Sequence, residues 1–169
     1  LDAIWLNQYR SPIGLLKKAT KDNLNVRANF SLLSMLISLT ENRQTQALSE
    51  NASTLPILSI NGTEASCQRF KVPNETKLMA SKASCFQVAI NNVLSLRDAD
   101  ILTLLDSCLV KRNPQLLRDI VKLCQLIFAD NSNAYKQGDF IEQLIDKVNA
   151  VQAKPYVDLG LKGLEIKQA

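Results

Sequence analysis

Residues 113–127 of the chain read NPQLLRDIVKLCQLI, and this stretch decides the fold class. Asn113 followed by Pro114 is a helix start signal, because proline lacks the N–H that would stay unpaired at the first helical position. The apolar side chains beyond it recur every three or four residues, on one face of a helix: Leu117, Ile120, Val121, Cys124 and Ile127. Such a face has to be buried, so we expect the segment to pack inside a helical core.

Helical spacing of apolar residues continues on both sides of this stretch, and no strand-like alternation persists. The sequence therefore predicts an all-α fold, a compact bundle of six to seven helices forming a single domain over residues 1–169. A length of 169 residues and an apolar content of 46% suit one domain with its own core. The expected helices cover residues 2–19, 30–40, 75–96, 98–111, 113–127 and 140–151, with a short final helix over 159–164.

A polar excursion, residues 44–72, interrupts this pattern, and we expect one long loop there between the second and third helices. Asparagines in N-x-S/T sequons gather in and around it: Asn29, Asn51, Asn61 and Asn74. No asparagine after Asn74 lies in such a sequon. This density indicates an N-glycosylated, secreted protein whose long loop carries most of the glycans.

Asn29 conflicts with one placement of the second helix. If that helix began at Asp22, Asn29 would share a face with Leu33 and Leu36, where a glycan does not fit. We favour a helix that begins near Asn29, with residues 20–28 as a connector. The alternative is that Asn29 carries no glycan.

Four cysteines, Cys67, Cys85, Cys108 and Cys124, are widely spaced, and the chain has no histidine. The sequence therefore lacks the patterns of zinc fingers and of thioredoxin-like motifs. In a secreted chain, four such cysteines are expected to form two disulfides. The alternative is four reduced, buried thiols in a cytosolic helical protein.

The pairing of these cysteines follows from helix geometry. Cys85 lies about twelve residues before a turn at Arg97 and Cys108 about eleven after it, so the two are nearly level on antiparallel helices. Cys108 and Cys124 would be offset by roughly 9 Å, beyond disulfide reach. We therefore expect the pairs Cys85–Cys108 and Cys67–Cys124.

The absence of histidine also removes the Ser-His-Asp and Cys-His nucleophiles and every His-ligated metal centre. Paired acids such as Asp98 and Asp100 stand at helix starts, where they favour the helix dipole. We expect no enzyme, no catalytic residue, no metal and no cofactor.

Charge and hydropathy narrow the partners. The net charge of +4 is spread along the chain, without the dense basic stripe and interleaved aromatics of a nucleic-acid binder, so no nucleic acid is expected. The charge-free run 28–40 is too short for a transmembrane segment. A chain that begins at Leu1 resembles one left by signal-peptide cleavage.

Two functions fit these expectations. The first is a secreted, extracellular recognition module that binds a protein partner as a ligand, inhibitor or receptor-binding domain. The alternative is a carrier whose helices enclose a small hydrophobic or lipid ligand in a cavity. The phenylalanines available to line such a cavity are Phe30, Phe86, Phe128 and Phe140.

Overall fold

The computed structural model describes residues 25–46, 55–129 and 134–151. All regular structure in these ranges is helical, which confirms the all-α prediction. The elements are α3 Val26–Gln46, α4 Asn61–Arg69, α5 Asn74–Asn91, the short 3₁₀ helix η1 Val93–Ser95, α6 Asp98–Ser107, α7 Pro114–Phe128 and α8 Lys136–Ala150. The helices expected over residues 2–19 and 159–164 lie outside the described ranges.

Two helix starts are capped by asparagine side chains, and the sequence predicted the one at Asn113. The side chain of Asn113 accepts a hydrogen bond from the backbone N–H of Leu116 at 3.2 Å, with Pro114 at the first helical position of α7. Asn25 does the same for α3, accepting from the N–H of Ala28 at 2.9 Å. The helix α3 thus begins at Val26, so the connector expected over residues 20–28 is wrong for residues 26–28, and Asn29 lies inside the helix.

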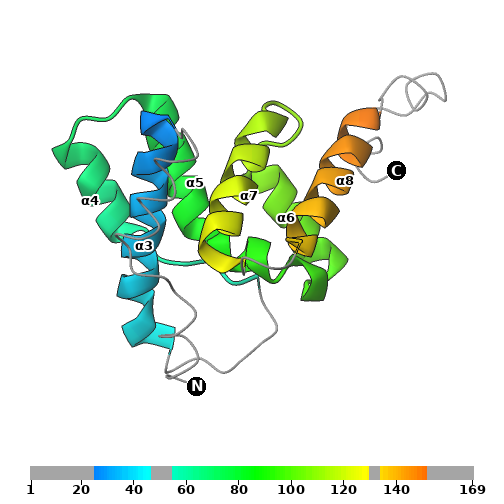
Figure 1. Ribbon diagram of the computed structural model, residues 1–169, viewed down its shortest axis with the longest axis horizontal. Helices are drawn as coiled ribbons and strands as arrows, with labels where there is room; N and C mark the ends of the chain where they lie inside the picture. Colours follow the sequence, from blue (N-terminus) through cyan, green and yellow to red (C-terminus); the bar gives the residue numbers. More distant parts are fainter. Residues whose placement is uncertain (1–24, 47–54, 130–133, 152–169) are drawn as a thin grey trace.

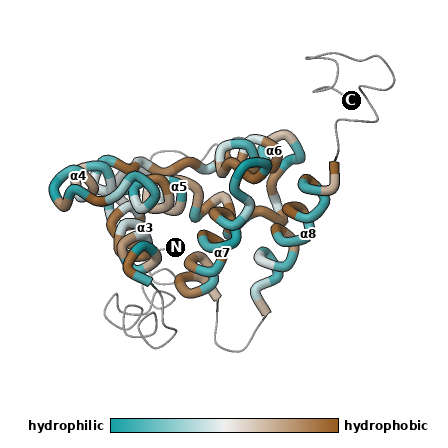
Figure 2. Tube along the Cα trace, turned by 90° about the horizontal axis from the view of Figure 1, so that it is seen from above, coloured by the Kyte–Doolittle hydropathy of each residue, from teal (hydrophilic) through white to brown (hydrophobic). Residues whose placement is uncertain are grey.

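The single long loop expected over residues 44–72 is wrong, because the helix α4 lies inside it. This helix is short and polar, and its buried positions are Thr63 and Cys67, one turn apart. Figure 2 shows mainly hydrophilic residues along α4. So few apolar positions leave hardly any helical period to detect in the sequence.

The helices form a row in which α4 and α8 stand at opposite ends (Figure 1). The helix α3 packs along α5, α5 packs against α7, and α7 packs against α8. Fully buried side chains between the helices of this row are mostly aliphatic and include Leu32, Met35, Met79, Ile90, Leu117, Ile120, Leu123, Ile141 and Ile145. The predicted inward face of residues 113–127 lies in this core, with Val121 half-buried.

A buried polar network fastens the segment before α4 to the core. The Asn42 side chain donates to the carbonyl of Ser59 and accepts from its N–H, each at 3.0 Å. The hydroxyl of Ser38 donates to the same carbonyl at 2.9 Å. Within α4, the hydroxyl of Thr63 donates to that of Ser84 on α5 at 3.0 Å. Because buried polar groups are costly when unpaired, this network fixes where α4 starts.

The end of α4 is closed by a Schellman motif. The N–H of Val72 donates to the carbonyl of Cys67 and the N–H of Lys71 to that of Gln68, both at 3.3 Å. Lys71 occupies the left-handed position of the motif with φ 48°, where glycine is usual. The side chains of Phe70 and Lys71 are therefore held on a backbone that is fixed by hydrogen bonds and not on a flexible loop.

The variant Lys71→Gly is expected to raise the free energy of unfolding by about 0.5–1 kcal/mol. An L-residue in the left-handed conformation costs about 1–2 kcal/mol, and the greater unfolded-state entropy of glycine returns part of that gain. Urea unfolding followed by circular dichroism measures the difference. Lys71→Ala is the matched control, since it removes the same ammonium but keeps the strain. Equal stability of the two variants would contradict the expectation.

Candidate nucleic-acid interface

The surface where α4 turns into α5 combines exposed cations with an exposed aromatic ring. We call it the α4–α5 corner and define it as Arg69, Phe70, Lys71 and Lys77. All four side chains are exposed, and Phe70 keeps 66% of its surface in solvent. Figure 1 shows that this turn lies at the end of the row opposite α8. A large aromatic residue left in solvent beside cations is a common feature of binding surfaces.

The ring of Phe70 is supported from one side. Its centroid lies 6.5 Å from that of Phe30 on α3, and the two ring planes are nearly perpendicular at 83°. Such an arrangement is a favourable one for aromatic pairs. Together with the Schellman motif, this contact holds Phe70 in place while most of its surface stays accessible.

The cations of the corner are not neutralised within the described part of the chain, where no salt bridge includes Arg69, Lys71 or Lys77. By contrast, Arg27, Arg97 and Arg118 each form a salt bridge, for example Arg118 with Glu142 at 2.6 Å. The charge of the corner is therefore available to an external anion.

Acidic groups near the corner are few. Glu64 lies close enough to Cys67 to help raise the pKa of that thiol, which burial raises first and Lys77 lowers. Glu75 lies 3.8 Å from Arg27, whose guanidinium also donates to Asp119 at 3.0 Å. Arg27 is shared between Asp119 and Glu75, so the corner sets three cations against two nearby acids, Glu64 and Glu75, and its balance is positive.

The first turn of α5 adds to this field. The helix begins at Asn74, between Lys71 and Lys77 of the corner; Glu75 lies in its first turn, and no side-chain cap hydrogen bond is made at its start. Eighteen residues of aligned peptide dipoles leave partial positive charge at that end. Cations and a helix N-terminus side by side favour phosphate, and the exposed ring adds a surface on which a base can stack.

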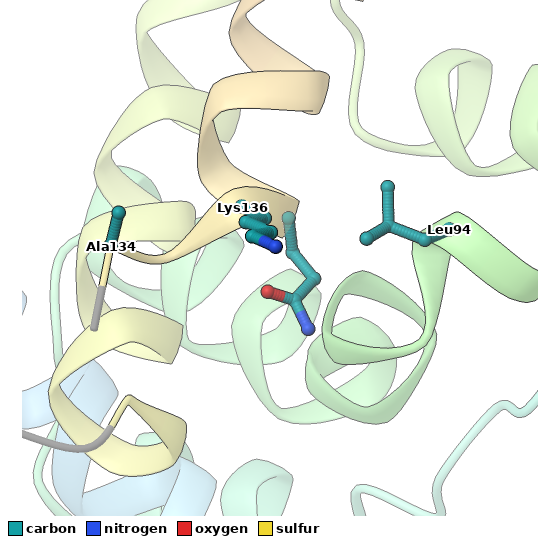
Figure 3. Close-up of a pocket in the computed structure, with 4 residues that line it drawn as sticks. Leu94, Ala134 and Lys136 are labelled. Carbon is teal, nitrogen blue, oxygen red and sulfur yellow. The ribbon is translucent and has the colours of Figure 1, made fainter.

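A hollow lies at the other end of the row, between η1 and the start of α8 (Figure 3). Its volume is about 470 Å³, and it is lined by Leu94, Ala134, Lys136 and Gln137. It is open to solvent and half polar, so it does not resemble the enclosed apolar cavity of a lipid carrier.

The structure places the predicted glycosylation sites in different surroundings. Asn61 and Asn74 are exposed first residues of α4 and α5, whereas Asn29 is half-buried on α3. Asn51 lies outside the described ranges. Thr63, which completes the Asn61 sequon, is fully buried and hydrogen-bonded, so the core accounts for its presence.

The predicted disulfides are not formed, because Cys67, Cys85, Cys108 and Cys124 are all free thiols. The pair Cys67–Cys124 fails on topology: α4 packs on α3 and α5, and Figure 1 shows α7 on the far side of α5. Cys108 lies close enough to interact electrostatically with Cys85 and also with Cys124, so the structure does not favour the predicted pairing over Cys108–Cys124.

Burial sets the chemistry of these thiols. Loss of hydration raises the pKa of Cys108 to about 12, against a smaller opposing effect of Lys82. Burial raises the pKa of Cys124 as well, with Cys108 adding to it. Thiols that resist ionisation are poor nucleophiles, and these behave as small apolar core residues.

Neither a metal site nor a membrane-spanning helix is found among the described residues. No group of histidine, cysteine, aspartate or glutamate side chains there is arranged to hold a metal ion. None of the described helices combines the length and hydropathy needed to cross a membrane.

The fold and the corner thus define a class: a helical protein with an exposed cationic and aromatic surface. The chain is similar to the CCA-adding enzyme of Pseudomonas putida (strain W619), with 33% identity over 102 residues. It is also similar to the multifunctional CCA proteins of Tolumonas auensis and Pseudoalteromonas atlantica, each 31% identical, over 105 and 106 residues respectively.

Each of these similarities covers 60% of the chain but only 26–28% of the relative. The chain therefore spans little more than a quarter of the length of the curated relatives it matches. No family model matches the chain. No solved structure matches it either.

These relatives overturn several expectations drawn from the sequence. A secreted, non-enzymatic recognition module and an extracellular lipid carrier are both wrong, because the similar proteins are named as a CCA-adding enzyme and as multifunctional CCA proteins. The expectations of an extracellular location and of a glycoprotein are wrong for the same reason. The expectation of no nucleic acid is also wrong, since the relative from Pseudomonas putida is a CCA-adding enzyme.

Proposed function

We propose that this chain is a helical part of a CCA-adding enzyme and that its α4–α5 corner holds the RNA substrate. The observation that carries the proposal is the 33% identity over 102 residues to a CCA-adding enzyme. The substrate class of such an enzyme is tRNA. Similarity alone does not say which surface meets the RNA, and the corner supplies that surface.

Among the basic surfaces of the described residues, the corner is the one that combines cations with an exposed aromatic ring, which favours it as the RNA-binding surface. Lys111 and Arg112 are also exposed and unpaired there, after the end of α6, but no exposed aromatic ring accompanies them. The corner offers three cations, an aromatic ring and a helix N-terminus together. Phosphate contacts supply most of the affinity for RNA, and a ring adds contact with bases.

The proposal assigns RNA positioning to the described residues. Transfer of a nucleotide needs the growing RNA end held in line with the incoming phosphate, and binding the RNA body at a distance contributes to that orientation. It also places the protein among cellular RNA, in a compartment where thiols stay reduced. The four free cysteines agree with that setting.

The full 169-residue chain is expected to bind a tRNA transcript that ends before its CCA, with a dissociation constant on the order of 1–100 μM at about 0.15 M salt. Fluorescence anisotropy of the labelled transcript, repeated over a range of salt concentrations, measures the binding. Three phosphate contacts predict a log–log salt slope of about −2 to −3. Absence of salt-dependent binding would contradict the proposal.

A further inference from the structure

We propose that Phe70 stacks on an unpaired base of the bound RNA, so that the corner recognises a looped or single-stranded nucleotide and not a base-paired stem. This inference rests on the proposed function and adds to it the kind of RNA element that the corner selects. It comes from the position of one side chain. In the described part of the chain, Phe70 is the one aromatic residue whose ring is mainly in solvent, at 66% exposure.

Burial of the other rings shows that this exposure is not a general property of the fold. Phe86 and Tyr135 are buried at 5% and 7% exposure, and Phe30 is half-buried. Leaving Phe70 mostly in water forgoes the free energy that burial of its ring would contribute. No packing role within the described residues accounts for that cost beyond its contact with Phe30.

The ring is also held in advance of binding. The Schellman hydrogen bonds fix the backbone on both sides of Phe70, and Phe30 restrains the ring at 6.5 Å. Phenylalanine has two rotatable side-chain bonds, so little conformational entropy is lost when a base stacks on it. A preorganised ring of this kind acts as a platform rather than as a flexible hydrophobic contact.

The residues that flank Phe70 in the chain are both cationic. Arg69 precedes Phe70 and Lys71 follows it, so a cation stands on each side of the ring in the chain. A nucleotide likewise carries a phosphate on each side of its base. In an A-form stem the faces of the bases are already stacked on their neighbours, and a protein ring cannot reach them. Only an unpaired base can use the ring and both cations at once.

The test compares two RNA probes with one protein pair. The first probe is an RNA hairpin with 2-aminopurine at an unpaired loop position, and the second is a fully paired duplex of equal length. The wild-type chain is expected to bind the hairpin roughly tenfold more tightly than the duplex and to change the 2-aminopurine fluorescence. In Phe70→Leu, which keeps an apolar side chain without a π-face, hairpin affinity is expected to fall roughly tenfold to the level of the duplex.

Phe70→Trp serves as the matched control, because it keeps an aromatic face and is expected to retain the preference for the hairpin. Circular dichroism of each variant confirms that the helices are intact. Equal binding of hairpin and duplex by the wild type, or an unchanged preference in Phe70→Leu, would overturn the inference. Salt-dependent binding of both probes in that case would leave the proposed function standing, whereas a wild type that binds no RNA would overturn both.

Discussion

Replacing Arg69, Lys71 and Lys77 together by glutamine is expected to lower the affinity of the chain for tRNA about a hundredfold at 0.15 M salt. Each phosphate that loses its cation no longer releases a counterion on binding, and at this ionic strength each release contributes a factor of about five. Glutamine keeps the length and much of the polarity of lysine and arginine. The three side chains are exposed and form no salt bridge within the described residues, so the fold is expected to be unaffected.

The measurement is the same anisotropy titration over several salt concentrations. In the triple variant the log–log slope is expected to become shallower by two to three units, because three phosphate contacts are lost. A second triple variant provides the control: Lys111→Gln, Arg112→Gln and Lys122→Gln remove the same charge from exposed positions elsewhere. If both variants lose affinity equally, the chain binds RNA through its net charge and the corner has no special role.

Lys71→Gly separates charge from fold at the same site. This variant is expected to be more stable than the wild type and yet to bind RNA less tightly, because it removes the strain at φ 48° and the ammonium together. Opposite changes in stability and affinity cannot come from partial unfolding. The variant thereby excludes the simplest alternative explanation of a loss of binding.

The fold was predictable where apolar residues recur at helical spacing over several turns. Residues 113–127 show this best: Leu117, Ile120 and Cys124 are buried in α7, as their spacing predicted. The helix α4 shows the opposite case, with Thr63 and Cys67 as its buried positions. Its place depends on hydrogen bonds to α5 and to the segment before it, and contacts between distant residues leave no local pattern.

The environment of the protein was mispredicted because two short patterns have other physical origins. Cysteines in the interior of a helical core act as small apolar side chains, and an even number of them does not require bridges. The sequon at Asn61 contains a threonine that the core needs for a hydrogen bond. Two such coincidences pointed in the same direction and reinforced each other.

The candidate site could have been suspected from three consecutive residues. Arg69, Phe70 and Lys71 place an aromatic residue between two cations, which is a short form of the basic and aromatic pattern sought in the sequence. The pattern indicates a binding surface only because Phe70 is exposed. That exposure depends on where α4 ends and on where α3 lies, which the sequence does not show. Lys77 joins the corner because the next helix begins three residues earlier, at Asn74.

Stability is expected to fall steeply between about pH 9 and pH 12, and buried thiols are the main cause. Cys108 has a pKa raised from 9.0 to about 12 in the folded chain, because burial disfavours its thiolate. The unfolded chain loses this proton above pH 9 and the folded chain keeps it, so the thiol's contribution is complete below pH 9 and is lost as the pH rises. Three pKa units correspond to about 4 kcal/mol, with about half lost near pH 10.5.

Cys124 and Tyr135 act in the same direction, since burial raises the pKa of both groups. Urea unfolding at a series of pH values, with reductant present throughout, measures the effect. Cys108→Ala is the matched variant: it is expected to be less stable at pH 7 because of the cavity, and to lose less stability than the wild type above pH 9. A wild-type stability that is flat up to pH 11 would contradict the expectation.

Adding reductant at pH 8 separates this explanation from disulfide bonding, because free thiols leave the unfolding midpoint unchanged whereas a reduced disulfide would lower it.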